Sequence, residues 1–450
     1  MLNAIWDLFF FAVALGVLVT VHEAGHFFAA RACGVTVQRF SIGFGKLIFK
    51  RTGSDGCEYA ISALPLGGYV KMLGENDESS ESGSFKSKRL WQRAIIIAAG
   101  PVSNILLAFF LYCAVNMIGF DAPRPVIGDV VPGSAVAECG ITEGSEIKSV
   151  NGESVATWSD AIILFYQAIQ SGRNIEFKTV LKNGGQSTGE CVVKTAGFQD
   201  PDQNDFLQAM GIRRYQGYIS NVISEVQSGS PAQSAGLKPG DAIVAVNGHK
   251  TPTWYRVADA IRQYGASKLD LTVERDGELY DCVLTPRLVY NKALRRDVPL
   301  AGIAVRPDND SYKATWHYVS YSFSDSLSRA FRETVRMSHL VISAAVKMIS
   351  GAVSPDNVSG PIAIAKGAGE SASVGAVFFL SFLAVISVNL GILNLLPIPI
   401  LDGGQLMFMA YEAVTGRAPG QKVQYALTLL GFSLLLMLML LAVFNDIRGL

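Results

Sequence analysis

The chain has 450 residues, of which half are apolar and only 17% are charged. This length allows several domains, and the composition indicates membrane spans combined with soluble domains. The net charge is zero, which argues against a nucleic-acid partner because nucleic-acid-binding proteins need a basic face. The six cysteines include no C-x-x-C pair, which argues against a disulfide scaffold or a cysteine-built zinc site. We therefore expect Cys139, Cys191 and Cys282 to be unpaired, buried small residues.

Four apolar stretches reach the roughly 20 residues that a membrane span requires. They cover residues 5–30, 94–120, 374–401 and 423–444. The first stretch lacks the basic start and the A-x-A cleavage site of a signal peptide, so we interpret it as a span. Basic residues crowd the segment 31–93, and none precedes the first span. By the positive-inside rule this segment is cytoplasmic, whereas both termini and residues 121–373 are external.

The first span contains His22-Glu23-Ala24-Gly25-His26, an H-E-x-x-H motif. Residues four apart share one face of a helix, so the two imidazoles can bind one ion while Glu23 lies beside them to act on a water. Two core histidines are the alternative. A carboxylate inside a membrane span is costly and rare, which favours a catalytic zinc site over that alternative.

The cytoplasmic segment predicts two strands, residues 35–50 and 57–72, around a turn at 52–56. We expect these strands to form a β-hairpin region, and a plain surface hairpin is one interpretation of it. Residues 76–84 (NDESSESGS) are expected to be a flexible loop. Four glycines in the strands permit close approach of another backbone: Gly43, Gly45, Gly67 and Gly68.

The external region contains a repeat. Residues 229–248 (GSPAQSAGLKPGDAIVAVNG) align without a gap with residues 133–152 (GSAVAECGITEGSEIKSVNG). Each copy predicts a short helix ending at a glycine, an apolar strand and an Asn-Gly hairpin turn. The pattern resembles the PDZ domain, which binds extended chain ends by strand addition. The first copy departs from it at Glu143-Gly144-Ser145, where the second has Pro-Gly-Asp, and two inert β-domains are the alternative.

Residues 309–373 connect the repeat to the third span. The part 321–350 predicts an amphipathic helix with Phe323, Leu327, Ala330 and Thr334 near one face. The part 351–370 is punctuated by glycine and proline. We interpret it as a packing linker, with a lid or substrate clamp as the alternative.

Catalytic zinc usually has three protein ligands, so a third must come from outside the first span. The remaining histidines fall in the external region, on the wrong side of the membrane. The third span runs inward and ends in Asn394-Leu-Leu-Pro397-Ile-Pro399-Ile-Leu-Asp402-Gly-Gly. Asp402 is an acid at the matching depth, although Asp-Gly is also ordinary turn chemistry. Pro397 and Pro399 break the helix, which a membrane tolerates only where the backbone lines a cavity or is buried in protein.

HEAGH and NLLPIPILDGG together resemble the paired motifs of the site-2 protease family of intramembrane zinc metalloproteases. The tandem PDZ-like repeat on a four-span chain resembles bacterial members, so the likeness covers essentially the whole chain. It implies one zinc ion bound by His22, His26 and Asp402, with Glu23 as the general acid and base. It also implies that a sheet edge near the zinc receives the substrate. The residues implied as active-site wall are Asn394, Pro397 and Pro399.

The expected fold is a polytopic α-helical membrane protein with four spans, a cytoplasmic membrane-associated β-hairpin region and two external PDZ-like α+β domains in tandem. The expected domains are 1–120, 121–215, 216–308, 309–373 and 374–450. The resemblance implies a multi-pass protein of the bacterial inner membrane, with periplasmic termini and PDZ-like domains and an active site toward the cytoplasm. It also implies cleavage of membrane-spanning proteins, namely an anti-sigma factor in envelope-stress signalling and remnant signal peptides. A PDZ scaffold without catalysis and a transporter that uses the intramembrane acids as a relay are the alternatives.

Overall fold

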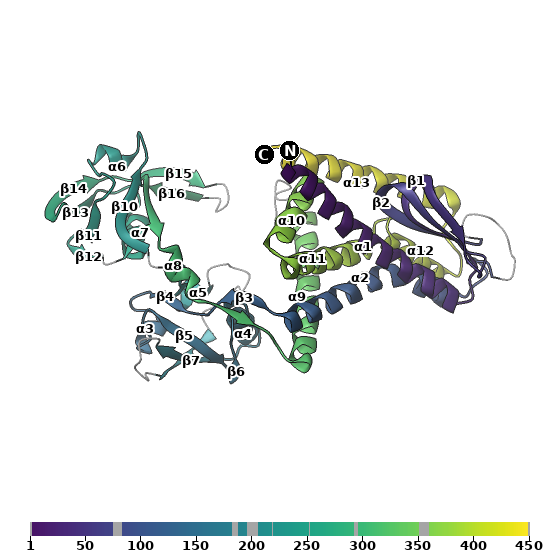
Figure 1. Cartoon of the computed structure of the whole chain (residues 1–450), viewed down its shortest axis with the longest axis horizontal. Coiled ribbons are helices and arrows are strands. Elements are labelled where there is room, and N and C mark those ends of the chain that lie inside the picture. The colour runs from purple at the N-terminus through teal and green to yellow at the C-terminus, as the bar shows by residue number, and fades with distance from the viewer. Residues whose placement is uncertain are drawn as a thin grey trace. The chain divides into compact units, whose positions relative to one another are not determined.

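The computed structural model describes residues 2–74, 83–181, 188–195, 206–217, 219–251, 253–291, 296–350 and 360–448. The chain divides into two compact units, and each is described by itself (Figure 1). One unit combines Met1–Phe120 with Ser320–Leu450, and the other is Asp121–Val319. Of the predicted loop 76–84, only Gly83 and Ser84 lie within the described residues.

Among the described residues, four helices of the first unit are long and apolar enough to cross a membrane, which confirms the four predicted spans. The third span was predicted to reach residue 401, but its helix ends at Asn394. Pro397 and Pro399 lack the N–H groups that would continue the helix, so the boundary was wrong for that reason. Asp402 instead opens a separate helix, α12 (Asp402–Thr415). The spans are α1 (Leu2–Ala32), α2 (Leu90–Ile118), α11 (Ala376–Asn394) and α13 (Gln421–Arg448).

Helix α2 is central to this unit and packs against both α1 and α11. Glycines make the approach possible, as is usual where membrane helices meet. A Cβ atom added to Gly25 on α1 would lie 2.3 Å from the carbonyl oxygen of Ala99 on α2. One added to Gly391 on α11 would lie 2.8 Å from the carbonyl oxygen of Pro101. This packing holds the H-E-x-x-H turn of α1 directly against α2.

The residues predicted as a hairpin form two long antiparallel strands, β1 (Val37–Thr52) and β2 (Glu58–Met72). Each strand bends back on itself, so residues 39–42 pair with 58–61 on one side and with 68–71 on the other. Residues 47–52 complete the sheet by pairing with the far side of 58–62. The bends coincide with Gly43, Gly45 and Gly67, whose φ angles of 88°, 87° and 140° favour glycine.

Helix α9 (Phe323–Ile349) matches the predicted amphipathic helix, but its buried face differs from the predicted one. Ala330 and Thr334 are buried, whereas Phe323 and Leu327 are exposed. Helix α9 packs against α2, and the small side chains on its inner face allow the two helices to approach closely. Large apolar side chains such as Phe331 and Leu340 are left on the outer face.

Helix α10 (Pro361–Val374) lies where a linker was expected, and that interpretation was wrong for residues 361–370. Residues 351–359 lie outside the described part of the chain. Pro361 stands at the first helical position, where its fixed φ suits a helix start. The Asp446 carboxylate, from α13, accepts hydrogen bonds from the backbone N–H groups of Gly360, Ile362 and Ala363, which caps α10.

In the second unit the two repeat copies share the order strand, helix, strand, strand, helix, strand, strand, and they differ in the elements that follow (Figure 1). Both Asn-Gly pairs turn as the sequence predicts, with φ of 49° at Asn151 and 48° at Asn247. The first copy contains β4 (Ile127–Val130), α3 (Ala135–Glu138), β5 (Ser145–Val150), β6 (Glu153–Ser154), α4 (Trp158–Gln170), β7 (Ile175–Leu181), β8 (Thr188–Val193), α5 (Phe206–Met210) and β9 (Ile212–Arg214). The second contains β10 (Ile219–Val226), α6 (Pro231–Ser234), β11 (Ala242–Val246), β12 (His249–Lys250), α7 (Trp254–Tyr264), β13 (Leu269–Arg275), β14 (Glu278–Leu284), β15 (Arg287–Asn291), β16 (Arg296–Leu300) and β17 (Ile303–Pro307). Three short elements join the copies to the rest: β3 (Phe120–Pro123), α8 (Asn309–Lys313) and β18 (Trp316–Val319).

The departure of the first copy from the PDZ-like pattern has a structural counterpart. In the second copy Asp241 is fully buried and accepts hydrogen bonds from Arg275 Nε at 2.6 Å and Nη2 at 2.8 Å. These bonds lower the pKa of the Asp241 carboxyl below its usual value. In the first copy the corresponding Ser145 has Leu181 as its strand partner. A neutral contact thus replaces the ion pair.

Cys139 and Cys191 form a disulfide, which corrects the expectation that both are unpaired. Cys139 ends α3 and Cys191 lies in β8, and their Cα atoms are 5.3 Å apart, within the range of a disulfide. They are separated by 52 residues, so no local spacing reveals the pair. Cys282 is free and half-buried.

Candidate metal centre and active site

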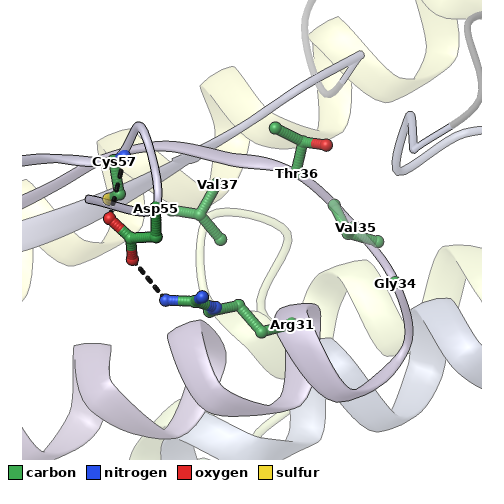
Figure 2. A pocket seen from close by; sticks show the side chains of 7 residues that line it. All are labelled: Arg31, Gly34, Val35, Thr36, Val37, Asp55 and Cys57. Atoms are coloured by element: carbon green, nitrogen blue, oxygen red, sulfur yellow. Dashed lines mark hydrogen bonds and ion pairs between the residues drawn. The ribbon is translucent and has the colours of Figure 1, made fainter. Parts of the chain in front are cut away.

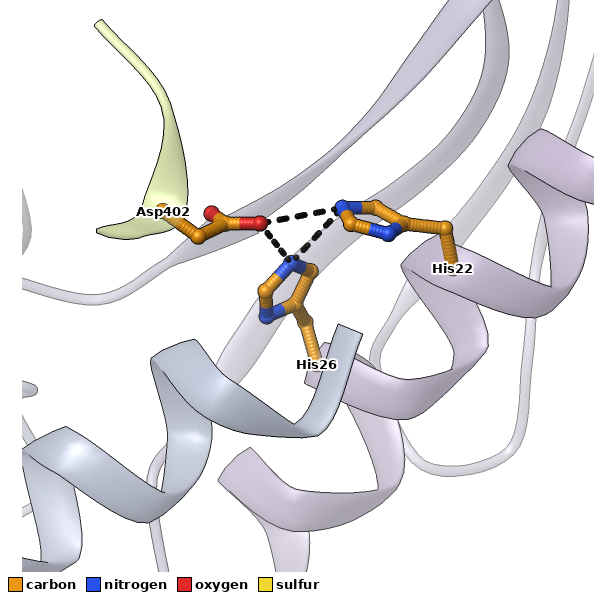
Figure 3. A group of neighbouring side chains, drawn as sticks. All are labelled: His22, His26 and Asp402. Carbon is orange, nitrogen blue, oxygen red and sulfur yellow. Dashed lines mark hydrogen bonds and ion pairs between the residues drawn. The ribbon is translucent and has the colours of Figure 1, made fainter. Parts of the chain in front are cut away.

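Three predicted site residues from opposite ends of the chain meet in the first unit (Figure 3). His22 and His26 are one helical turn apart on α1, and their Nε2 atoms are 3.2 Å apart. The Oδ2 atom of Asp402 lies 3.2 Å from His22 Nε2 and 3.6 Å from His26 Nε2. The three side chains are only 9–16% exposed, so they form a largely buried cluster.

The spacing of these three atoms fits a single zinc ion. Ligand atoms at about 2.0–2.1 Å from zinc in a tetrahedral arrangement lie about 3.3–3.4 Å from one another. The three observed separations, 3.2, 3.2 and 3.6 Å, bracket this value. Two imidazoles and one carboxylate are also the donor set of many catalytic zinc sites, which keep a fourth position open. The residues present therefore fit the metal.

Backbone contacts of the following helix fix the position of Asp402. Asp402 is the first residue of α12, where a carboxylate interacts favourably with the helix dipole. Gly403 and Gly404 come next, and their turn packs directly on the segment after α11. A Cβ atom on Gly403 would lie 2.2 Å from the Leu396 carbonyl oxygen, and one on Gly404 would lie 2.3 Å from that of Ile398. Any side chain at either glycine would push Asp402 away from the histidines.

Glu23 lies between the two histidines in sequence and is half-buried on α1. Its neighbour in the sheet is Gly68 of β2, since a Cβ atom on Gly68 would lie 2.9 Å from Glu23 Cγ and 3.1 Å from Val19 Cγ1. The same atom would lie 2.8 Å from the Ser41 carbonyl oxygen. The glycine predicted to permit close approach thus allows the 68–72 edge of the sheet to contact the helix turn that carries Glu23.

The structure places the remaining predicted residues in the sheet and in the segment at the end of α11. Gly43, Gly45 and Gly67 occupy the bends of the sheet. Asn394 is the last residue of α11 and is half-buried, Pro397 is exposed, and Pro399 is half-buried. Pro399 also lies against α13, because a Cβ atom on Gly431 would be 3.3 Å from its Cδ. Their role as active-site wall stays a prediction.

Sequence reasoning missed three contributions of α2 to the cluster. The Ile96 carbonyl oxygen lies 2.8 Å from His26 Nδ1, and the Asn104 amide lies 3.2 Å from His22 Nδ1. Gly100 gives the His26 ring its space, since a Cβ atom there would lie 2.2 Å from His26 Nε2. The run Gly100-Pro-Val-Ser-Asn104 carried a signal, because a polar amide inside a span needs a reason.

A separate cavity of about 290 Å³ lies beside the end of α1 and the turn between β1 and β2 (Figure 2). Arg31 Nη1 donates a hydrogen bond of 2.5 Å to Asp55 Oδ2 there, so its charge is already paired. None of the three clustered residues lines this cavity, and we give it no part in the chemistry. Its lining consists of Arg31, Gly34, Val35, Thr36, Val37, Asp55 and Cys57.

Comparisons with known proteins identify the family of the chain. The model of peptidase family M50 matches residues 10–438. The chain is 41% identical to the regulator of sigma-E protease RseP of Salmonella typhimurium and of Escherichia coli, over 99% of each chain in both cases. It is 38% identical, again over 99% of both chains, to a Vibrio cholerae protein assigned by name to the zinc metalloproteases.

The structure also matches a solved PDZ domain of an SdrC-like protein from Listeria monocytogenes. The matched region covers 21% of this chain and 90% of the Listeria chain. Its sequence identity is 17% and its TM-score 0.17, so it carries no argument about the fold. The family match and the full-length identities decide the matter: the chain belongs to peptidase family M50, the site-2 proteases, and is a zinc metalloprotease.

Proposed function

We propose that the chain is an intramembrane endopeptidase whose one zinc ion is held by His22, His26 and Asp402. The observation that carries this proposal is the meeting of three ligand atoms within 3.2–3.6 Å of one another, on helices that are candidate membrane spans or adjoin one. When bound, zinc lowers the pKa of a water to about 7 and polarises a carbonyl group.

Glu23 is the general base and acid in this proposal. It neighbours a ligand in sequence and lies beside the 68–72 edge of the sheet. It takes the proton from the water that attacks the scissile carbonyl, and it returns a proton to the departing amine. Asn394, Pro397 and Pro399 form the wall of the site, with the Asn394 amide available to a substrate carbonyl.

A substrate helix must be unwound before its peptide bonds can be attacked, because its backbone groups are hydrogen-bonded to one another. We infer that the 68–72 segment of β2 replaces those bonds by accepting the substrate as an added strand. One side of this segment pairs with residues 37–42, and within the described residues no strand pairs with its other side. Gly68 leaves this edge without a side chain at the point next to Glu23.

The substrates in this proposal are single-span membrane proteins, namely an anti-sigma factor and remnant signal peptides. The relatives' names connect them with sigma-E, which supports the first of these. The protein would lie in the inner membrane of a bacterium, with termini and PDZ-like domains in the periplasm. The Cys139–Cys191 disulfide supports a periplasmic second unit, since disulfides persist in oxidising compartments. The two repeat copies, as tandem PDZ-like domains, would exclude substrates with bulky external domains.

Co-expression of the chain with a single-span substrate tests this function. Wild type should cleave the substrate, and Glu23→Gln should not. Glu370→Gln, at an exposed carboxylate on α10, is the matched control and should cleave normally. Cleavage by Glu23→Gln at the wild-type rate would overturn the assigned mechanism. A scaffold or transporter function would instead predict no proteolysis by any of the three proteins.

A further inference from the structure

The side chain of Asn104 is fully buried on α2 and faces a proposed zinc ligand. Its Nδ2 atom lies 3.2 Å from His22 Nδ1, the ring nitrogen that points away from the cluster of ligand atoms. Its Oδ1 atom is buried and has no hydrogen-bond partner among the described residues. A buried amide oxygen without a partner is costly, so this arrangement requires an explanation.

The chemistry of His22 supplies that explanation. To offer the lone pair of Nε2 to a metal, a neutral imidazole must carry its proton on Nδ1. An Nδ1–H group facing an amide NH₂ would place two donors together. Rotation of the Asn104 amide by half a turn exchanges its oxygen and nitrogen, which occupy nearly equal positions and are assigned from hydrogen bonding. Oδ1 then accepts from Nδ1–H, so two donors no longer face each other and the buried oxygen gains a partner, while the NH₂ group takes the former place of the oxygen.

Two comparisons within the structure support this arrangement. The other histidine is held in the same way, because His26 Nδ1 lies 2.8 Å from the Ile96 carbonyl oxygen of α2, an atom that only accepts. The backbone at Asn104 is also fixed, since Ser387 Oγ on α11 donates a hydrogen bond of 2.7 Å to its carbonyl oxygen. Helix α2 would thus provide one acceptor for each imidazole.

We propose that Asn104 is a positioning residue of the metal centre. Its side-chain oxygen holds His22 in the tautomer and ring orientation that present Nε2 to zinc. This inference rests on the proposed zinc site. It adds a residue that lies outside both the H-E-x-x-H motif of α1 and the Leu-Asp402-Gly segment that begins α12. Partners of this kind change metal affinity by about 10–100-fold when they are removed.

Zinc affinity of the purified full-length chain, measured by competition with a chromogenic chelator, tests the proposal without reference to proteolysis. Asn104→Leu, which has neither donor nor acceptor, should bind zinc about 10–100-fold more weakly than wild type. Asn104→Asp keeps the acceptor and should bind at least as tightly as wild type. Asn389→Leu is the matched control, because Asn389 bonds only to the Val385 carbonyl of its own helix in the contacts described, and should leave the affinity unchanged.

Zinc affinity equal to that of wild type in Asn104→Leu would overturn the proposal. An equal loss of zinc affinity in Asn104→Asp and Asn104→Leu would also overturn it, because that result indicates a packing role alone. A second measurement needs no variant. In zinc-loaded wild type with ¹⁵N-labelled histidine, His22 should show a protonated Nδ1 and a metal-bound Nε2. An unprotonated Nδ1 overturns the proposal even if Asn104→Leu does not fold. A wild type that binds no zinc would overturn the proposed function as well, whereas failure of the variants alone leaves that function standing.

Discussion

Gly100→Ala should weaken zinc binding although it adds only a single methyl group. The new Cβ atom would lie 2.2 Å from His26 Nε2, and also 2.6 Å from Cε1 and 2.8 Å from Cδ2 of the same ring. Ordinary contact between heavy atoms begins near about 3.5 Å, so the ring must move by about 1.3 Å. Zinc sites tolerate deviations of only about 0.2 Å in their ligand distances. The required shift is several times larger, so one of the three ligands should be lost.

The ring has little freedom to avoid this clash, because its Nδ1 atom is hydrogen-bonded to the Ile96 carbonyl. Overpacking of this kind also costs about 1–3 kcal/mol of folding stability. We expect zinc affinity to fall by at least about tenfold, in line with losses at ligand-orienting positions. Chelator competition on the purified chain measures that affinity, and thermal unfolding of the metal-free chain measures the packing cost separately.

Gly16→Ala on α1 is the matched control, because a Cβ atom at Gly16 would meet nothing within 4 Å. This variant should bind zinc and cleave substrate as wild type does. If Gly100→Ala also bound zinc with wild-type affinity, the His26 ring could not be held where the structure places it. The reasoning from the α1–α2 packing would then fail.

Three further predictions concern the second unit. Because Arg275 lowers the folded-state pKa of Asp241, the stability that this pair gives is present above the unfolded pKa near 3.9 and is lost as the pH falls through the folded value. The protection factors of the backbone amides in β11 and β13 of the full chain, which compare exchange with the intrinsic rate at the same pH, should therefore fall in acid. Asp241→Asn should show faster exchange already at pH 7, and equal exchange in the two proteins at pH 7 would refute this role. The Cys139–Cys191 disulfide closes a 52-residue loop, which stabilises the folded state by up to about 4 kcal/mol. Replacing both cysteines by serine should therefore speed amide hydrogen exchange in β8. Unchanged exchange would contradict the pairing. Deleting residues 121–308 should allow substrates with intact external domains to be cut, and unchanged discrimination in the co-expression assay would count against gating by the two repeat copies.

Local patterns were enough to predict the spans and the strand–turn–strand segments. The four apolar runs are each long enough to dictate a helix, and Asn-Gly at 151–152 and 247–248 dictates a turn. The same approach failed where tertiary contacts decide the outcome. Helix α10 depends on a cap from Asp446, 86 residues away, and its Gly-rich sequence gives little local support. The Cys139–Cys191 bond likewise depends on the fold of the first repeat copy and on no nearby spacing.

The proposed ligands were easier to identify than the residues that hold them. H-E-x-x-H specifies two imidazoles on one helix face, and the membrane depth of Asp402 pointed to a third ligand. The supporting contacts of α2 are a backbone carbonyl at Ile96, an absent side chain at Gly100 and an amide at Asn104. Two of these three have no side-chain chemistry to detect in a sequence. Only the buried polar amide of Asn104 broke a local rule that could have drawn attention to it.

The zinc content of the purified chain tests the central claim most directly, because the claim joins residues from opposite ends of the sequence into one metal site. Wild type and Glu23→Gln should each contain about one zinc per chain, since Glu23 is not a proposed ligand. Asp402→Ala should contain almost none after dialysis against a weak chelator. A full zinc complement in Asp402→Ala would contradict the site, and so would its loss in Glu23→Gln with Asp402 intact.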